Sequence, residues 1–230
     1  MDEINRAIRE VNDLLLDGTG STIVYGGVCD QDTYQGDVIN GIGTLFLLKE
    51  VNDPNGKSAW SLVDHIRNQA SCKSDSPDKH YEFYRLWKNV ARWMRLILKP
   101  DQNFIDLADD DLRAALIHIA AINVNKAPGN PSSNAKVLLH HLDASANCEV
   151  LLREIDILAP RLVVCGGTFD LAVKLLGVEA PKLLSNGARY FKLEKRVFLE
   201  APHPAWFVVN DRILFAYFKD TMNALRHIKD

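Results

Sequence analysis

The run GTLFLLKEV at residues 43–51 decides the fold class of this chain. It is a continuous apolar run that lies between glycine residues and the turn-forming sequence NDPNG at 52–56. A short apolar run with no polar alternation is typical of a strand that is buried on both faces. Since helices on both sides of a sheet bury a strand in this way, the run predicts an α/β domain.

Four further segments have the pattern of strands, at 115–124, 161–167, 188–193 and 196–201, and residues 21–27 form a short strand or turn. Helices are predicted over residues 3–16, 58–68, 80–99, 134–157, 168–177 and 210–228. This alternation of apolar strands and helices predicts a three-layer αβα sandwich with a central, mostly parallel sheet.

Length and composition fit one soluble globular domain over residues 1–230. The chain is 47% hydrophobic and 25% charged, and no Pro-, Gly- or Ser-rich linker divides it. No apolar run reaches the roughly 18 residues of a membrane-spanning helix, and the first residues are acidic and amphipathic, unlike a signal peptide. We therefore expect a cytoplasmic monomer that does not contact a membrane.

The cysteines and the net charge narrow the function classes. Four cysteines are scattered without a C-x-x-C pair, which argues against a zinc site, an iron–sulfur cluster or a disulfide framework and favours reduced thiols. The formal net charge of −3 counts mildly against a nucleic-acid protein, although a local basic face stays compatible with it.

The segment 80–99 carries the clearest helical pattern and a basic stripe. Its apolar face consists of Leu86, Val90, Trp93 and Ile97. Its opposite face consists of Arg85, Lys88, Arg92, Arg95 and Lys99. The stripe is either a solvated face, which we favour, or a contact for a phosphate backbone.

Polar residues follow four of the predicted strands directly. The four loops are KEVNDPNG at 49–56, NVNKAPGNPSSN at 123–134, CGGTF at 165–169 and APHPAWF at 201–207. Ligands of open α/β sheets bind outside the carboxyl ends of the strands. We therefore expect the four loops to converge on one edge of the sheet.

The first loop offers Glu50, Asn52 and Asp53. Carboxylates at such a place can act as general bases, position a water or stabilise a developing cation. The alternative is ordinary turn chemistry. Glu50 ends a strand buried on both faces, so its charge needs a partner or a task.

The second loop offers Asn123 and Lys126. An amide carries two donors and an acceptor, so a fixed Asn123 can bind the amide edge of a pyrimidine. Lys126 could contact a phosphate. The alternative is an asparagine that caps a helix or loop.

The third loop is a strand-to-helix junction at Gly166, Gly167 and Thr168. Backbone N–H groups and the helix dipole favour an anion such as a phosphate there. A plain tight turn is the equal alternative. The loop has neither G-x-G-x-x-G nor a Walker lysine, so a dinucleotide or ATP site is unsupported.

The fourth loop places His203 between Pro202 and Pro204, which rigidify the backbone. A rigid donor suits catalysis, because a hydrogen bond aimed at developing charge needs no reorganisation during the reaction. The alternative is a histidine in a rigid turn. Trp206 and Phe207 follow, and simple packing would explain both.

The order of these loops resembles the uracil-DNA glycosylase superfamily. The segments that carry the resemblance are LFLLKEVNDPNG, HIAAINVNK, LVVCGGTFD and FLEAPHPAWF. In that family a first strand ends in an acidic or amide motif, a later strand ends in a base-reading Asn, another enters a glycine turn, and the last ends in His-Pro. The resemblance covers residues 43–228, and residues 1–42 form an N-terminal extension outside it.

The resemblance implies roles for the loop residues. His203 would donate to the uracil oxygen that gains charge, and Asn123 would bind the uracil edge. Trp206 or Phe207 would be the apolar wedge that replaces an extruded base.

The first motif departs from the family patterns G-Q-D-P-Y and G-x-N-P. Matching NDPN to QDPY selects Asp53 as the catalytic carboxylate, whereas counting from the strand selects Glu50, or Asn52 as an amide. The segment QDTYQGD at 31–37 resembles QDPYHG superficially, but it follows only a short strand and would leave the run at 43–51 without a role.

The implied activity is that of a DNA glycosylase in base excision repair. It would hydrolyse the N-glycosidic bond of uracil or another damaged base flipped out of single- or double-stranded DNA, without a metal or cofactor. Two alternatives stay open. One is a catalytically silent member that binds nucleic acid or a modified nucleotide. The other is a hydrolase of small nucleotides, which suits the negative net charge better.

Overall fold

The computed structural model describes residues 2–16, 23–49, 60–71, 83–126 and 145–228. Within these residues, seven strands form one sheet in the order β2-β5-β3-β6-β9-β8-β7, and β1 pairs with β4 beside it. The strands are β1 (Val24–Tyr25), β2 (Gly27–Val28), β3 (Thr44–Leu48), β4 (Trp60–Ser61), β5 (Ile119–Asn123), β6 (Leu162–Gly166), β7 (Lys182–Leu183), β8 (Arg189–Leu193) and β9 (Arg196–Ala201).

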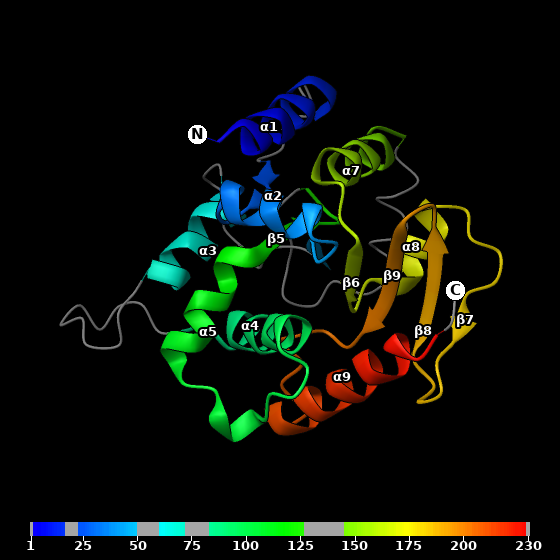
Figure 1. The fold of residues 1–230 in the computed structure, drawn as a ribbon. Coiled ribbons are helices and arrows are strands. Elements are labelled where there is room, and N and C mark those ends of the chain that lie inside the picture. Colours follow the sequence, from blue (N-terminus) through cyan, green and yellow to red (C-terminus); the bar gives the residue numbers. More distant parts are fainter. Residues whose placement is uncertain (1, 17–22, 50–59, 72–82, 127–144, 229–230) are drawn as a thin grey trace.

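Helices cover both faces of this sheet. They are α1 (Glu3–Leu16), α2 (Gln31–Ile39), α3 (Leu62–Ser71), α4 (Arg85–Leu98), α5 (Asp109–Ala115), α7 (Ser145–Leu158), α8 (Phe169–Leu175) and α9 (Asp211–Arg226), with 3-10 turns η1 (Phe104–Asp106) and η2 (Leu116–His118). Figure 1 shows α1 and α7 on one side of the sheet and α4 and α9 on the other.

The central four strands, β5, β3, β6 and β9, are parallel, and the outer strands are antiparallel to their neighbours. After β3, the next strand of this sheet along the chain is β5, which lies on one side of β3 and β6. After β6, the chain forms β7, β8 and β9, which lie on the other side. A crevice forms at the carboxyl edge where strand connections diverge in this way. This places the expected ligand edge at the ends of β3 and β6.

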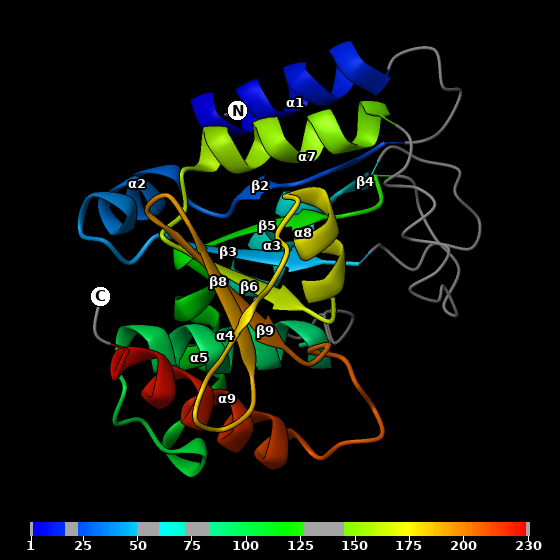
Figure 2. The ribbon, with the colours of Figure 1, turned by 90° about the vertical axis from the view of Figure 1, so that its right-hand side faces the viewer.

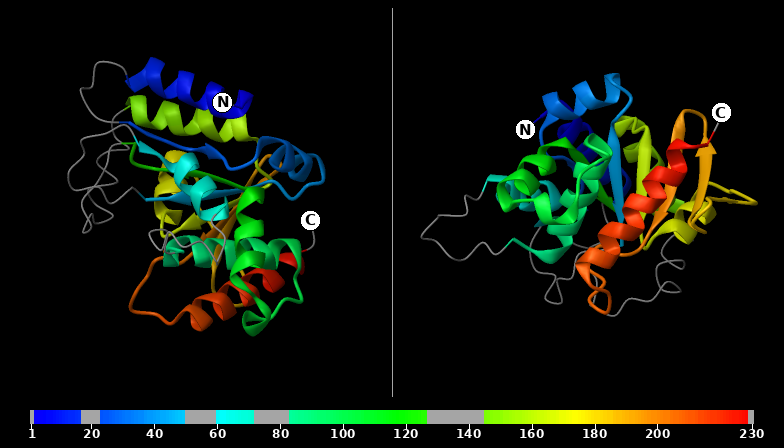
Figure 3. Two further views of the ribbon diagram at one scale, coloured as in Figure 1. Left: turned by 90° about the vertical axis from the view of Figure 1, so that its left-hand side faces the viewer. Right: turned by 60° about the horizontal axis from the view of Figure 1, so that its bottom comes forward.

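The core has two halves separated by the sheet, and β3 contributes to both. Leu45 and Leu47 pack with α1, α2, α7 and α8, whereas Phe46 and Leu48 pack with α3, α4, α5 and α9. Every residue of β3 is buried, as the apolar run predicts. Figure 2 and Figure 3 show the two helical layers with the sheet between them, so the α/β architecture with a mostly parallel sheet is confirmed.

Two element boundaries differ from the sequence prediction. The strand predicted from residue 115 begins only at Ile119, because α5 and η2 occupy the residues before it. Three aspartates open α5, where the helix dipole favours them, and Leu112, Arg113 and Ala115 at its end are buried. Apolar character alone therefore does not separate the two elements. Similarly, α3 begins at Leu62 and not at 58, after the short strand β4.

Residues before β3 are joined to the sheet. β2 pairs with β5, and the Asn5 side chain forms hydrogen bonds with both the N–H and the carbonyl oxygen of Val28. α1 also packs along α7. Across the described residues, no helix combines the length and apolarity needed to cross a bilayer.

Candidate functional site

The four polar loops leave the sheet at one edge, as expected. Asn123 lies beside Leu48 in the strand register, and Gly166 lies beside Ala201. Neighbouring strands are about 4.8 Å apart, so the ends of β5 and β6 are separated by roughly 10 Å, with β3 between them.

After β9 the chain turns back across the end of β6, which brings His203 beside Gly167. A Cβ atom on Gly167 would lie 3.2 Å from the Cβ of His203 and 3.4 Å from the Cε of Lys49. Gly167 has a positive φ of +72°, which glycine adopts without strain. The glycine turn thus allows the histidine and the lysine to approach the same point from β9 and β3.

His203 is held as a neutral imidazole with a defined tautomer. Its Nδ1 accepts a hydrogen bond from the Ala205 N–H at 3.1 Å, so the proton of the neutral ring belongs on Nε2. Burial lowers the pKa of His203 to about 4, and the positive charge of Lys49 contributes to the same shift. At neutral pH the ring is therefore a donor through Nε2.

Asn123 ends β5 and is almost fully buried, with 2% of its surface exposed. Its amide nitrogen Nδ2 has no hydrogen-bond partner among the described residues. A buried donor left unsatisfied costs about 1–3 kcal/mol. Such a group at a ligand-binding edge is suited to a ligand that supplies an acceptor.

Lys126 has a partner within the fold and differs from the expected phosphate contact. Its ammonium forms an ion pair with Glu154 on α7, and both side chains are buried. Asn12 on α1 donates to the other carboxylate oxygen of Glu154 at 2.8 Å. Burial lowers the pKa of Lys126, against the opposing effect of Glu154. This pair fixes α7 and α1 to the end of β5.

The glycine turn after β6 also uses its polar groups internally. The Gly167 N–H donates to the Ala201 carbonyl at 2.9 Å, and the buried Thr168 hydroxyl donates to the Leu47 carbonyl at 2.7 Å. Leu48 and Pro204 crowd Gly166, since a Cβ there would meet both at 3.1 Å. These contacts favour a tight turn over an anion site at Gly166, Gly167 and Thr168.

An exposed apolar tip follows His203. Trp206, Phe207 and Val208 are 47%, 84% and 71% exposed. A cavity of about 470 Å³ lies behind this tip, between the end of β9 and α9, with Glu200 and Tyr217 in its lining.

Glu50, Asn52 and Asp53 lie outside the described residues, as does the loop after Lys126. Lys49 is the last described residue after β3, and sequence reasoning missed it. The feature that could have identified Lys49 from the sequence is its charge, because the residue directly follows a fully buried strand.

The basic stripe on α4 is only partly solvated, and four of its five cations pair with acidic side chains. Arg85 and Arg92 form ion pairs with Asp211, with N–O distances of 2.6 and 2.9 Å. Lys88 pairs with Asp109, and Arg95 lies 3.7 Å from Asp111. The favoured interpretation of a solvated face is wrong for these four cations, which acidic residues of α5 and α9 partly cover, whereas Lys99 is exposed as that interpretation expects.

Two comparisons with known proteins identify no relative of this chain. A scan against models of protein families finds no match to the chain, and a search of curated proteins finds no significant one. In the described part of the chain, no group of three or more His, Cys, Asp or Glu side chains could hold a metal ion. The candidate site therefore consists of His203, Lys49 and Asn123 at the carboxyl edge of the sheet.

Proposed function

We propose that this protein releases uracil or another damaged base from DNA by hydrolysing the N-glycosidic bond of a nucleotide flipped out of the strand. The observation that carries the proposal is the state of His203, a half-buried neutral imidazole whose Nδ1 accepts from Ala205 and whose remaining proton is on Nε2. A neutral donor held in place matches a reaction that creates negative charge on a leaving base.

In the proposed reaction, the bond between the base nitrogen and the sugar C1′ breaks and its electron pair stays with the base. Negative charge then grows on a carbonyl oxygen of the base, where His203 donates its Nε2 proton in a hydrogen bond. The positive charge of Lys49 lies beside His203 and favours the same anion. Water adds its oxygen to C1′ and keeps one hydrogen there as the new hydroxyl, and its other proton neutralises the departing base.

Asn123 would bind the base from the opposite side. Its free amide N–H can donate to a carbonyl of the base, and its oxygen can accept from a ring N–H. A carboxylate, Glu50 or Asp53, would stabilise the sugar cation or position the water.

The test is release of the base from labelled DNA containing uracil or hypoxanthine, in single and double strands, with free deoxyuridine and its nucleotides as further substrates. His203→Ala should lower kcat by about 10²–10³-fold, as expected for loss of one donor to a developing anion. Asn123→Ala should weaken selection of the base, and Glu50→Ala and Asp53→Ala should identify the carboxylate. His227→Ala, an exposed histidine at the end of α9, is the matched control.

Three results would contradict the proposal in different ways. DNA binding without abasic sites on any substrate would favour a catalytically silent binding protein. Cleavage of the free nucleoside or nucleotide alone would favour a small-nucleotide hydrolase. Full activity in His203→Ala would remove the histidine from the mechanism.

A further inference from the structure

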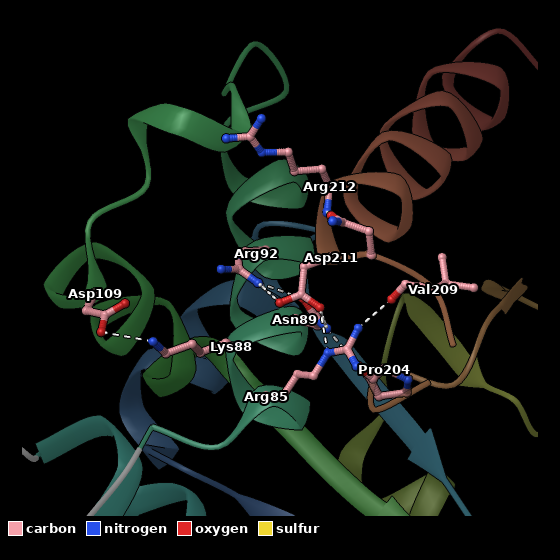
Figure 4. Close-up of polar contacts among 10 residues, drawn as sticks. Arg85, Lys88, Asn89, Arg92, Asp109, Pro204, Val209, Asp211 and Arg212 are labelled. Atoms are coloured by element: carbon pink, nitrogen blue, oxygen red, sulfur yellow. Dashed lines mark hydrogen bonds and ion pairs between the residues drawn. The ribbon is translucent and has the colours of Figure 1, made fainter. Parts of the chain in front are cut away.

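The loop 202–210, which follows β9, is held at both ends by one face of α4. Near its start, Asn89 Nδ2 donates to the Pro204 carbonyl oxygen at 2.8 Å. Near its end, the Arg85 guanidinium donates to the Val209 carbonyl oxygen. Two side chains one helical turn apart therefore fix two points of the same loop (Figure 4).

Asp211, the first residue of α9, joins these side chains into one cluster. Its Oδ1 accepts from Arg85 Nε at 2.6 Å and from Asn89 Nδ2 at 3.2 Å. Its Oδ2 accepts from Arg92 Nη1 at 2.9 Å, and Arg92 also donates to Asn89 Oδ1 at 2.8 Å. Figure 4 shows both arginines and the asparagine directed at this carboxylate.

Burial makes the cluster stiff. Asn89 is 1% exposed, and the Arg92 side chain is 14% exposed. Arg92 also lies over the Phe104 ring, 4.6 Å from its centroid. Loss of Asn89 would leave the Pro204 carbonyl without its donor in a place that water does not reach easily, so the network favours a single position of the loop.

The same loop determines how His203 is presented. The Trp206 N–H donates to the His203 carbonyl at 2.9 Å, and the Ala205 N–H donates to its ring Nδ1. The peptide carbonyl bound by Asn89 belongs to Pro204, which lies inside this turn. Movement of Pro204 would therefore loosen the bond that selects the histidine tautomer.

We propose that Asn89 and Asp211, supported by Arg85 and Arg92, are positioning residues that lock the loop 202–210 and so fix the orientation and tautomer of His203. The proposal rests on the function proposed above. It assigns to the basic face of α4 the positioning of His203, and not a contact with DNA. A displacement of about 1 Å at a reacting group can cost on the order of 100-fold in rate.

The test compares Asn89→Ala with Lys88→Ala in the full chain. Lys88 is the matched control, because it lies on the same helix and pairs with Asp109 without touching the loop. Nitrogen NMR of the His203 ring gives the tautomer and the pKa, and hydrogen exchange of the Ala205 and Trp206 amides reports on the turn.

In Asn89→Ala we expect a mixture of His203 tautomers, a pKa shifted upward from about 4 towards 6.5, and faster exchange of both amides. The value of kcat for base release should fall by about 10- to 100-fold with KM nearly unchanged. Lys88→Ala should leave all of these values as in the wild type. A second variant, Arg85→Gln, alters a partly exposed side chain and should give a smaller change of the same sign if Asn89→Ala does not fold.

The positioning proposal is overturned if the ring and amide signals of a folded Asn89→Ala or Arg85→Gln protein equal those of the wild type. Those signals need no substrate. Absence of base release by the wild type would therefore defeat the proposed function alone, while the NMR comparison still decides whether the cluster positions His203.

Discussion

At the scale of single residues, the candidate site depends on what can approach Gly167. Its positive φ and missing side chain leave room for His203 and Lys49, which arrive from two different strands. A histidine that is partly removed from water and lies next to a lysine is kept neutral, and a neutral histidine with its Nδ1 occupied is a donor through Nε2.

Gly167→Ala should displace His203 and weaken the fold. We expect a loss of about 1–2 kcal/mol from the left-handed backbone, a further loss from the contact at 3.2 Å with His203, and a changed His203 ring signal. Gly177→Ala is the matched control, since Gly177 has a similar φ of +62° with no atom within 4 Å of the added Cβ. Equal effects of the two variants in denaturant unfolding would show that the approach of His203 is unimportant.

Lys49→Gln should raise the pKa of His203 from about 4, and only in part, because burial is the larger cause of its shift. A histidine whose pKa is lower in the folded state contributes stability that is present above about pH 6.5 and is lost as the pH falls towards 4. The variant should therefore lose less stability than the wild type between these pH values. Proton NMR titration measures the pKa of His203, and urea unfolding at about pH 6.5 and pH 4 measures the change in stability. Lys182→Gln, at an exposed position, is the control.

At the scale of elements, buried ion pairs determine how helices attach to the sheet. Lys126 and Glu154 connect the end of β5 to α7, and Asn12 adds α1 to the same carboxylate. An ion pair without exposure is costly to break, because the remaining partner keeps its charge in a place without water.

Lys126→Met alone should destabilise the protein by about 3–5 kcal/mol, because it leaves Glu154 buried and unpaired. The double variant Lys126→Met/Glu154→Leu should recover much of that loss. Urea unfolding of the two single variants and the double variant gives the coupling energy. Additive single effects would mean that the pair does not act as a unit.

At the scale of the whole molecule, residues before β3 complete both the sheet and one helical layer. β2 extends the sheet beyond β5, and α1 covers α7 with Ile8 fully buried. Figure 2 shows α1 as the outer helix of that layer.

A chain that begins at residue 43 should therefore lose cooperative folding. Removal of α1, α2 and β2 uncovers one half of the core, so we expect no sharp thermal transition by circular dichroism. Glu10→Ala, on the exposed side of α1, should change the unfolding free energy by less than about 0.5 kcal/mol. An unchanged cooperative transition in the truncated chain would show that the core folds without residues 1–42.

The sequence by itself determined the fold class and the edge that carries the candidate site. Five buried residues in β3 and the alternation of strands with helices are local patterns, and the carboxyl ends of parallel strands must share one edge. The prolines on either side of His203 likewise predicted a loop with a restricted backbone.

Only the tertiary structure decided which polar groups pair within the fold and which are available to a ligand. Arg85 and Asp211 are 126 residues apart, and no local pattern predicts that they meet. The same holds for Lys126 with Glu154 and for the Gly167 N–H with Ala201. Charge pairing and burial depend on which elements pack together. The residues that the sequence suggested as phosphate contacts are therefore used within the fold, and no local pattern predicted that Lys49 lies beside His203.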